Sequence, residues 1–198
     1  HVPFLMRMGI SLEATGDLHE AIIQFERVLK IKPAHESAAN YRFQCGIKLW
    51  PEERYYQEIS NYVQLYPDRL KHQLNRLNFV LSVLNNLDTA MEIVNTCLSY
   101  YPDNQRANLY HALVLSWQER HEEARTSINR SISRWPHKND VHITLAQVEK
   151  NAGAPLAQIA ALNSMLELHG LQPVFSSSPD LAITPEYLCT ESDRIIND

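Results

Sequence analysis

The chain has 198 residues, of which 44% are hydrophobic and 21% charged, and a formal net charge of −5. This composition is typical of a globular protein that can bury a core. It excludes a bilayer-spanning helix, because no apolar run approaches the roughly 18 residues required, and it offers no clustered basic surface for nucleic acid. The cysteines Cys45, Cys97 and Cys189 are odd in number and widely spaced, which favours a reducing, cytoplasmic compartment.

The N-terminal residues predict a helix hairpin. Apolar residues at helical spacing, including Leu5, Met8 and Leu12, are followed by the turn signal Thr15-Gly16-Asp17. A second amphipathic segment then runs to Pro33. Asp17 and Glu20 have the spacing of a helix N-cap with its reciprocal glutamate.

This hairpin pattern recurs along the chain with a nearly fixed period. Prolines end the units at spacings of 34, 35, 34 and 37 residues, at Pro33, Pro67, Pro102, Pro136 and Pro173. Twelve residues before each proline lie Ala21, Tyr55, Ala90, Ala124 and Ala161, which are small except for the tyrosine. Four residues after these lie Phe25, Ile59, Val94, Ile128 and Met165. Such a period indicates a repeat protein.

The pattern has a physical reason. A small residue near the start of the second helix lets two helices approach closely, and the large apolar residue one turn later fills the space between them. The proline ends the second helix because it lacks an N–H and fixes φ. Further turn signals separate the helices of the later units, and Pro51 and Pro155 suit the first turn of a helix.

The chain therefore resembles the tetratricopeptide repeat family over residues 2–173, most clearly in the stretch from Gly16 to Pro33. The resemblance implies an all-α, right-handed superhelical solenoid of about five antiparallel helix pairs. The expected units cover residues 2–35, 36–69, 70–104, 105–138 and 139–173, followed by a C-terminal cap or linker at 174–198.

The resemblance also implies a non-catalytic scaffold that binds a protein or peptide on a concave face lined by the first helices. In this family the second, fifth, sixth, ninth, twelfth and thirteenth places of each unit line that face. The residues assigned to the groove are Asn40, Tyr41, Gln44, Lys48, His72, Asn75, Arg76, Phe79, Arg106, Tyr110, Leu113, Trp117, Ile143, Thr144 and Gln147.

Within this set, Leu113 and Ile143 fit packing better than specificity, whereas Arg76 and Arg106 are the best candidates to grip a carboxylate. Some relatives bind acidic C-terminal tails through a two-carboxylate clamp. The matching places here hold Met6, Ile10 and Tyr41, so we predict no clamp.

No constellation for catalysis is evident. The sequence has no helix-borne pair of histidines with a glutamate between them, no glycine-rich phosphate loop and no glycine-flanked nucleophile. We therefore expect neither an enzyme nor a cofactor or metal. Cys45 and Cys97 are expected to act as small buried hydrophobes, and the stretch Arg120–Arg125 is expected to be a solvated face.

Two alternatives stay open. Residues 162–188 are similar to the junction that links such repeats to a family 2 glycosyltransferase domain in bacterial proteins, which would make the chain an accessory domain in cell-envelope glycan assembly. Alternatively, exposed end helices would let the chain self-associate, for instance as a homodimer. A free-standing scaffold would have a protein or peptide as its partner, with no nucleic acid and no insertion into a membrane.

Overall fold

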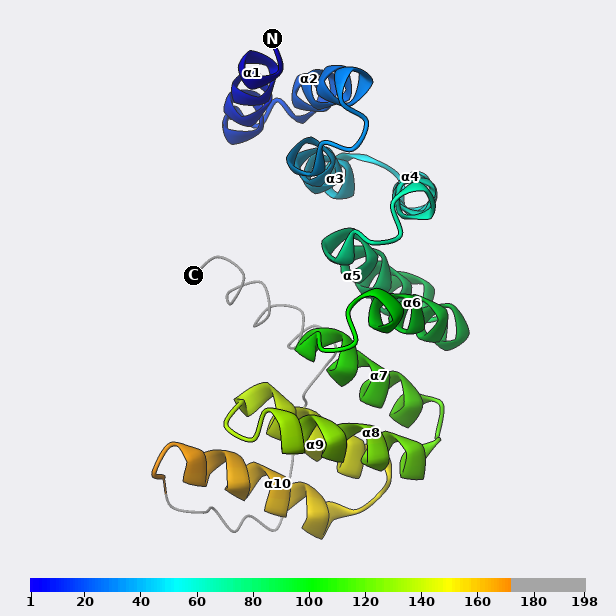
Figure 1. Cartoon of the computed structure of the whole chain (residues 1–198), viewed down its shortest axis with the longest axis vertical. Coiled ribbons are helices and arrows are strands. Elements are labelled where there is room, and N and C mark those ends of the chain that lie inside the picture. Colours follow the sequence, from blue (N-terminus) through cyan, green and yellow to red (C-terminus); the bar gives the residue numbers. More distant parts are fainter. Residues whose placement is uncertain (172–198) are drawn as a thin grey trace. The chain divides into compact units, whose positions relative to one another are not determined.

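The structure, a computed structural model, describes residues 1–171. These residues form ten α-helices and one short π-helical segment, with no strand among them (Figure 1). The elements are α1 (Val2–Thr15), α2 (Leu18–Ile31), α3 (Glu36–Leu49), α4 (Glu52–Leu65), α5 (Leu70–Phe79), η1 (Val80–Leu84), α6 (Leu87–Tyr100), α7 (Gln105–Trp117), α8 (His121–Arg134), α9 (Asn139–Asn151) and α10 (Pro155–Leu168).

The helices belong to two compact units. The N-terminal unit, His1–Arg76, contains α1 to α4 and most of α5, and the C-terminal unit begins at Leu77 and contains η1 and α6 to α10. Within each unit, consecutive helices pack against one another. The prediction of an all-α fold of consecutive, tetratricopeptide-like helix pairs is confirmed.

Backbone conformation explains most of the turns inside the pairs. The first helix of a pair is followed by a residue with positive φ in four of the five units, namely Gly16, Asn85, Glu119 and Gly153. The exception is Trp50, which is extended (φ −89°, ψ 149°). Trp50 precedes Pro51, and a residue before proline is disfavoured in helical conformations. Pro51 is the N-cap of α4 rather than a residue of its first turn.

Side-chain caps begin several helices. Asp17 Oδ1 accepts the Glu20 N–H at 3.3 Å, as predicted, whereas the Glu20 carboxylate accepts a bond from Gln24 instead of reaching back. Asn86 and Asn104 cap α6 and α7 in the same way, each at 2.9 Å. These bonds satisfy amide groups that have no partner inside their own helix.

Small residues lie where the helices of a pair meet. Ala21, Ala90 and Ala124 are fully buried, as predicted. The same closeness appears on α1, where a Cβ at Gly9 would lie 2.6 Å from the ring of Phe25. The helices of these pairs therefore approach closely at these points, whereas Tyr55 and Gln158 occupy the equivalent place in α4 and α10.

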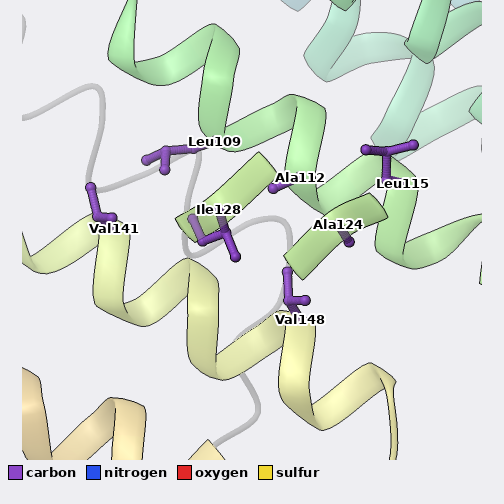
Figure 2. Packing of buried hydrophobic residues seen from close by; sticks show 7 residues of the cluster. All are labelled: Leu109, Ala112, Leu115, Ala124, Ile128, Val141 and Val148. Carbon is purple, nitrogen blue, oxygen red and sulfur yellow. The ribbon is translucent and has the colours of Figure 1, made fainter. Parts of the chain in front are cut away.

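The core of the C-terminal unit shows how one pair packs on the next. Figure 2 shows side chains from three successive helices meeting. The cluster consists of Leu109, Ala112 and Leu115 from α7, Ala124 and Ile128 from α8, and Val141 and Val148 from α9. The second helix α8 thus contacts both its own partner α7 and the first helix of the following pair, α9.

The third unit contains the π-helical segment, and its length explains why. The helix α6 begins 17 residues after α5 begins, whereas every other second helix begins 16 residues after its first helix. A π-turn contains one residue more than an α-turn. Val80–Leu84 therefore accommodates the extra residue that makes one proline spacing 35 rather than 34.

The fifth unit corrects one sequence assignment. Each second helix has its fourth residue at the helix interface: Ala21, Tyr55, Ala90, Ala124 and, in α10, Gln158. The residue equivalent to Ala124 is therefore Gln158, which is 2% exposed, and not Ala161. The sequence pattern was placed three residues late because it was anchored on Pro173, which lies outside the described residues together with the expected cap or linker at 174–198.

Candidate functional site

The first helices can be compared position by position when each is counted from its own first residue. Position 1 is then Val2, Glu36, Leu70, Gln105 or Asn139. Position 3 is buried in the four later helices, at Ala38, His72, Ala107 and Val141. Position 10 is likewise buried in those helices, at Cys45, Phe79, Val114 and Val148. Positions 3 and 10 therefore belong to the core.

Positions 6, 9 and 13 lie on a different side of the first helices. In α3 they are Tyr41, Gln44 and Lys48, and the last two are exposed. In the N-terminal unit we define the first-helix face by the residues at positions 2, 6, 9, 12 and 13. The small residues Ala14 and Ser37 and the proline Pro3 are left out. The face then consists of Arg7, Ile10, Glu13, Tyr41, Gln44, Ile47, Lys48, Lys71 and Asn75.

Positive charge prevails on this first-helix face. It carries three cations, Arg7, Lys48 and Lys71, all exposed, and one carboxylate, Glu13. Lys48 Nζ lies 3.6 Å from Glu13 Oε1, a loose pair on an open surface. The local excess of cations contrasts with the net charge of −5 of the whole chain.

Apolar and polar groups for a ligand flank these cations. The ring of Tyr41 stacks on that of Phe25, with centroids 5.4 Å apart and 16° between the planes. Ile47 is 58% exposed. Asn40, at position 5, has a buried Oδ1 without a hydrogen-bond partner among the described residues, whereas position 5 holds Leu74 and Leu109 in the next two first helices.

On α7 and α9 of the C-terminal unit, four of the seven groove candidates are buried. They are Tyr110 at 5%, Leu113 at 1%, Thr144 at 0% and Gln147 at 8% exposure. Tyr110 donates its hydroxyl to Asn78 Oδ1 at 2.7 Å. These four side chains therefore pack inside the described structure and offer little surface to a ligand.

Other polar groups of these helices also join one first helix to the next. Asn151 Nδ2 donates to Ser116 Oγ at 3.0 Å, and Gln105 Nε2 donates to Asp140 Oδ2 at 2.6 Å. Burial raises the pKa of Asp140. Arg106, Trp117 and Ile143 keep partial exposure, and the Arg106 guanidinium lies 5.7 Å from the ring centroid of Tyr110.

Three groove candidates on α5 stand at positions 3, 7 and 10 of the helix, and not at positions 2, 6 and 9 like their counterparts on α7. His72 and Phe79 occupy the core positions 3 and 10 and are 0% and 6% exposed. Arg76 occupies position 7, where it lies over the ring of Tyr56 at 5.6 Å and donates to its hydroxyl at 3.4 Å. The residues of this helix that match Arg106 and Leu113 are Lys71 and Asn78. The sequence assignment was one residue out for the third unit.

His72 lies in an aromatic cluster of the N-terminal unit. Its ring centroid is 5.6 Å from that of Phe43 and 4.7 Å from that of Tyr62. Neither ring nitrogen has a hydrogen-bond partner among the described residues. Burial, aided by the charges of Lys71 and Arg69, lowers the pKa of His72 to about 4.

Two charged networks escaped the sequence analysis. Arg42 of α3 bridges Glu26 of α2 at 3.1 Å and Glu58 of α4 at 2.9 Å. Arg125 of α8 pairs with the buried Glu149 of α9 at 2.7 Å. Arg125 was expected on a solvated face. A motif search over short sequence windows cannot find such pairs, because their partners are 16 or 24 residues apart.

The chemistry of the remaining reactive groups is ordinary. Cys45 and Cys97 are buried, as predicted, and burial raises the pKa of both thiols, that of Cys97 to about 11. Within residues 1–171, no three histidine, cysteine or acidic side chains are grouped so as to hold a metal ion. None of the described helices combines the length and apolar character needed to span a bilayer.

Comparisons with known proteins agree with the fold. Residues 2–35 match the family model described as tetratricopeptide repeat. A curated relative, anaphase-promoting complex subunit 7 of Dictyostelium discoideum, is 23% identical over 173 residues, which cover 86% of this chain but only 29% of the relative.

Solved structures share the architecture at low sequence identity. MamA of Desulfovibrio magneticus RS-1 gives a TM-score of 0.68 at 12% identity, covering 85% of this chain and 95% of that one. PilW, a type IV pilus biogenesis factor, gives 0.65 at 19% identity, covering 88% and 79%. The described helices therefore share the repeat architecture of these structures. Residues 2–35 thus match one tetratricopeptide repeat, and the described residues have a tetratricopeptide-like fold.

Proposed function

We propose that the first-helix face of the N-terminal unit binds an extended peptide that contains acidic residues. The observation that carries this proposal is the surplus of exposed cations, Arg7, Lys48 and Lys71, beside Tyr41 and the exposed Ile47. Cations on an open surface steer and hold carboxylates, and an aromatic ring next to them supplies the apolar contact that a peptide side chain needs.

The same face argues against a two-carboxylate clamp. A clamp requires cations and asparagine amides at set places of successive first helices. Ile10 and Tyr41 occupy two of those places, and the Tyr41 ring is already stacked on Phe25. The proposed ligand is therefore recognised by internal acidic side chains rather than by its C-terminal carboxylate.

This function needs no catalysis, so the prediction that the chain is not an enzyme fits it. The alternative of a glycosyltransferase accessory domain rests on residues 162–188, most of which lie outside the described residues. The matched family model and the relatives named above lend it no support.

The proposal is tested by selecting peptides from a displayed random 12-residue library on the immobilised chain. The selected sequences are expected to be enriched in Asp and Glu. A fluorescein-labelled copy of the strongest binder should bind the double variant Lys48→Glu/Lys71→Glu at least about tenfold more weakly. The matched control is Lys30→Glu, an exposed charge reversal on α2, which should leave the dissociation constant unchanged.

Two outcomes would contradict the proposal. Selected peptides without enrichment of acidic residues would remove the charge argument. An equal effect of the control and the double variant would show that net charge, and not the first-helix face, decides binding.

A further inference from the structure

The first helices α3 and α7 begin with the same hydrogen bond, made by two different side chains. In α7, Asn104 Oδ1 accepts the Ala107 N–H at 2.9 Å. In α3, His35 Nδ1 accepts the Ala38 N–H at 3.2 Å. His35 and Asn104 are each the N-cap of their helix. An ionisable ring therefore caps α3 at the place where an amide caps α7.

The bond in α3 requires one protonation state of His35. A ring nitrogen that accepts from an amide carries no proton, so the imidazole is neutral and holds its hydrogen on Nε2. A proton added to Nδ1 turns the acceptor into a donor and breaks the bond to Ala38. It also places a cation at the N-terminal end of the helix, where the aligned peptide dipoles are positive. Histidine is the side chain that makes this change between pH 5 and 8.

The charges beside His35 favour neither protonation state. On its own segment lie Glu36 and Lys32, whose carbonyl oxygen accepts the His35 N–H at 3.0 Å. The turn between α4 and α5 supplies Arg69, which pairs with Glu36 at 3.3 Å, and Asp68, which lies 4.0 Å from Arg69. These groups are two cations and two carboxylates. The bond to Ala38 and the helix dipole therefore decide the effect of a proton on α3.

The first turn of α3 is part of the core, so its loosening disturbs more than the cap. Ala38, whose amide donates to the ring, and the next residue, Ala39, are fully buried. Tyr41 follows on the same helix and stacks on Phe25 of α2, with centroids 5.4 Å apart. Protonation of His35 thus acts on the helix that carries Tyr41 of the first-helix face.

We propose that His35 is a proton-sensitive cap of α3. The neutral ring holds the first turn of this helix, and the protonated ring releases it. The helix α7 does not respond in this way, because Asn104 carries no titratable group. The proposal concerns α3 itself and does not depend on the peptide site proposed above.

Amide hydrogen exchange of the isotope-labelled chain at pH 7.5 and 5.5 tests the cap. In acid the protection factor of the Ala38 amide should fall by at least about fivefold relative to that of Ala107, the matched internal control. The variant His35→Asn copies the cap of α7, so its ratio should be the same at both pH values. His72 is present in both proteins, and a pH effect of its ring is therefore common to them.

The variant His35→Ala separates the hydrogen bond from the charge of the ring. It lacks the cap at either pH, so its Ala38 amide should be weakly protected at both. The inference would be overturned by a wild-type ratio that does not change with pH, or by an equal fall in His35→Asn. Strong protection of Ala38 in His35→Ala would also overturn it, because the ring would then contribute nothing.

The consequence for peptide binding rests on the function proposed above. Between pH 7.5 and 5.5, the dissociation constant of the selected acidic peptide should rise by a larger factor for the wild type than for His35→Asn. Protonation of the peptide affects both proteins alike. Equal rises would contradict a link between the cap and the first-helix face. An absence of binding at pH 7.5 would remove the proposed function alone, because the exchange measurement needs no peptide.

Discussion

Gly9 of α1 lies against the ring of Phe25 of α2, so closely that a Cβ at Gly9 would come within 2.6 Å of Phe25 Cε1. Phe25 is fully buried, so its ring has little room to shift in a closely packed core. This contact is a point of close approach between the first two helices.

Gly9→Val should therefore lower the free energy of unfolding by about 1–3 kcal/mol, the usual cost of overpacking a closely packed site. The control is Ala14→Val, which adds the same side chain to an exposed position of the same helix. Urea unfolding followed by circular dichroism measures both. Equal stabilities of the two variants would mean that the α1–α2 separation is not fixed by Gly9.

Ala124→Tyr tests the equivalent contact in the C-terminal unit. Ala124 is fully buried in the cluster shared by α7, α8 and α9, so a phenol ring there should force these helices apart. We expect a loss of roughly 1–3 kcal/mol or more, seen as a lower melting temperature. An unchanged melting temperature would contradict the close approach of α7 and α8.

The ion pair of Arg125 and Glu149 makes a separate prediction. Arg125→Met removes the partner of a carboxylate that is 7% exposed, and an unpaired buried charge is costly. Because the Arg125 side chain is 31% exposed, we expect a loss of only about 1–3 kcal/mol.

The double variant Arg125→Met/Glu149→Leu should recover most of that stability. Glu149 occupies position 11, which is held by Leu12 in α1 and Leu115 in α7, so a leucine fits there. Chemical denaturation of the single and double variants provides the comparison. A double variant less stable than Arg125→Met would show that the pair itself stabilises the helix contact.

His72 should make the free energy of unfolding decrease as the pH is lowered. Its pKa is about 4 in the folded chain and close to 6.5 when unfolded, so the unfolded state binds a proton first as pH decreases. The stability that neutral His72 contributes is fully present above about pH 7.5. It is lost as the pH falls from 6.5 to 4, and the free energy of unfolding decreases by roughly 3 kcal/mol at most.

The variant His72→Leu isolates this effect, since it replaces the ring by an apolar side chain at a core position. Urea unfolding at pH 7.5 and 5.0 should show a smaller loss of stability for His72→Leu than for the wild type. The same loss in both proteins would assign the pH dependence to other groups.

The sequence predicted the fold well because its signals are local. Proline soon after a second helix, at Pro33, Pro67, Pro102 and Pro136, and alanine near the start of that helix act within a single turn. Ala21, Ala90 and Ala124 could therefore be placed in the core without coordinates. The π-helical segment was foreshadowed only by a spacing of 35 residues, because a one-residue insertion can equally lengthen a loop.

The candidate site was predicted less completely, since its residues depend on register and on distant partners. An error of one residue in the third unit selected His72 instead of Lys71. The burial of Tyr110 and Gln147, and the pairing of Arg125 with Glu149, arise from packing between helices and have no local signal in the sequence.

The most direct test of the central proposal is to locate the bound peptide on the chain. Amide chemical shifts of isotope-labelled protein would be followed while the selected acidic peptide is added. We predict that the largest changes fall on α1 and α3, around Arg7, Tyr41 and Lys48, and at Lys71. Changes concentrated on the second helices α2 and α4, with these residues unaffected, would contradict the proposed first-helix binding face.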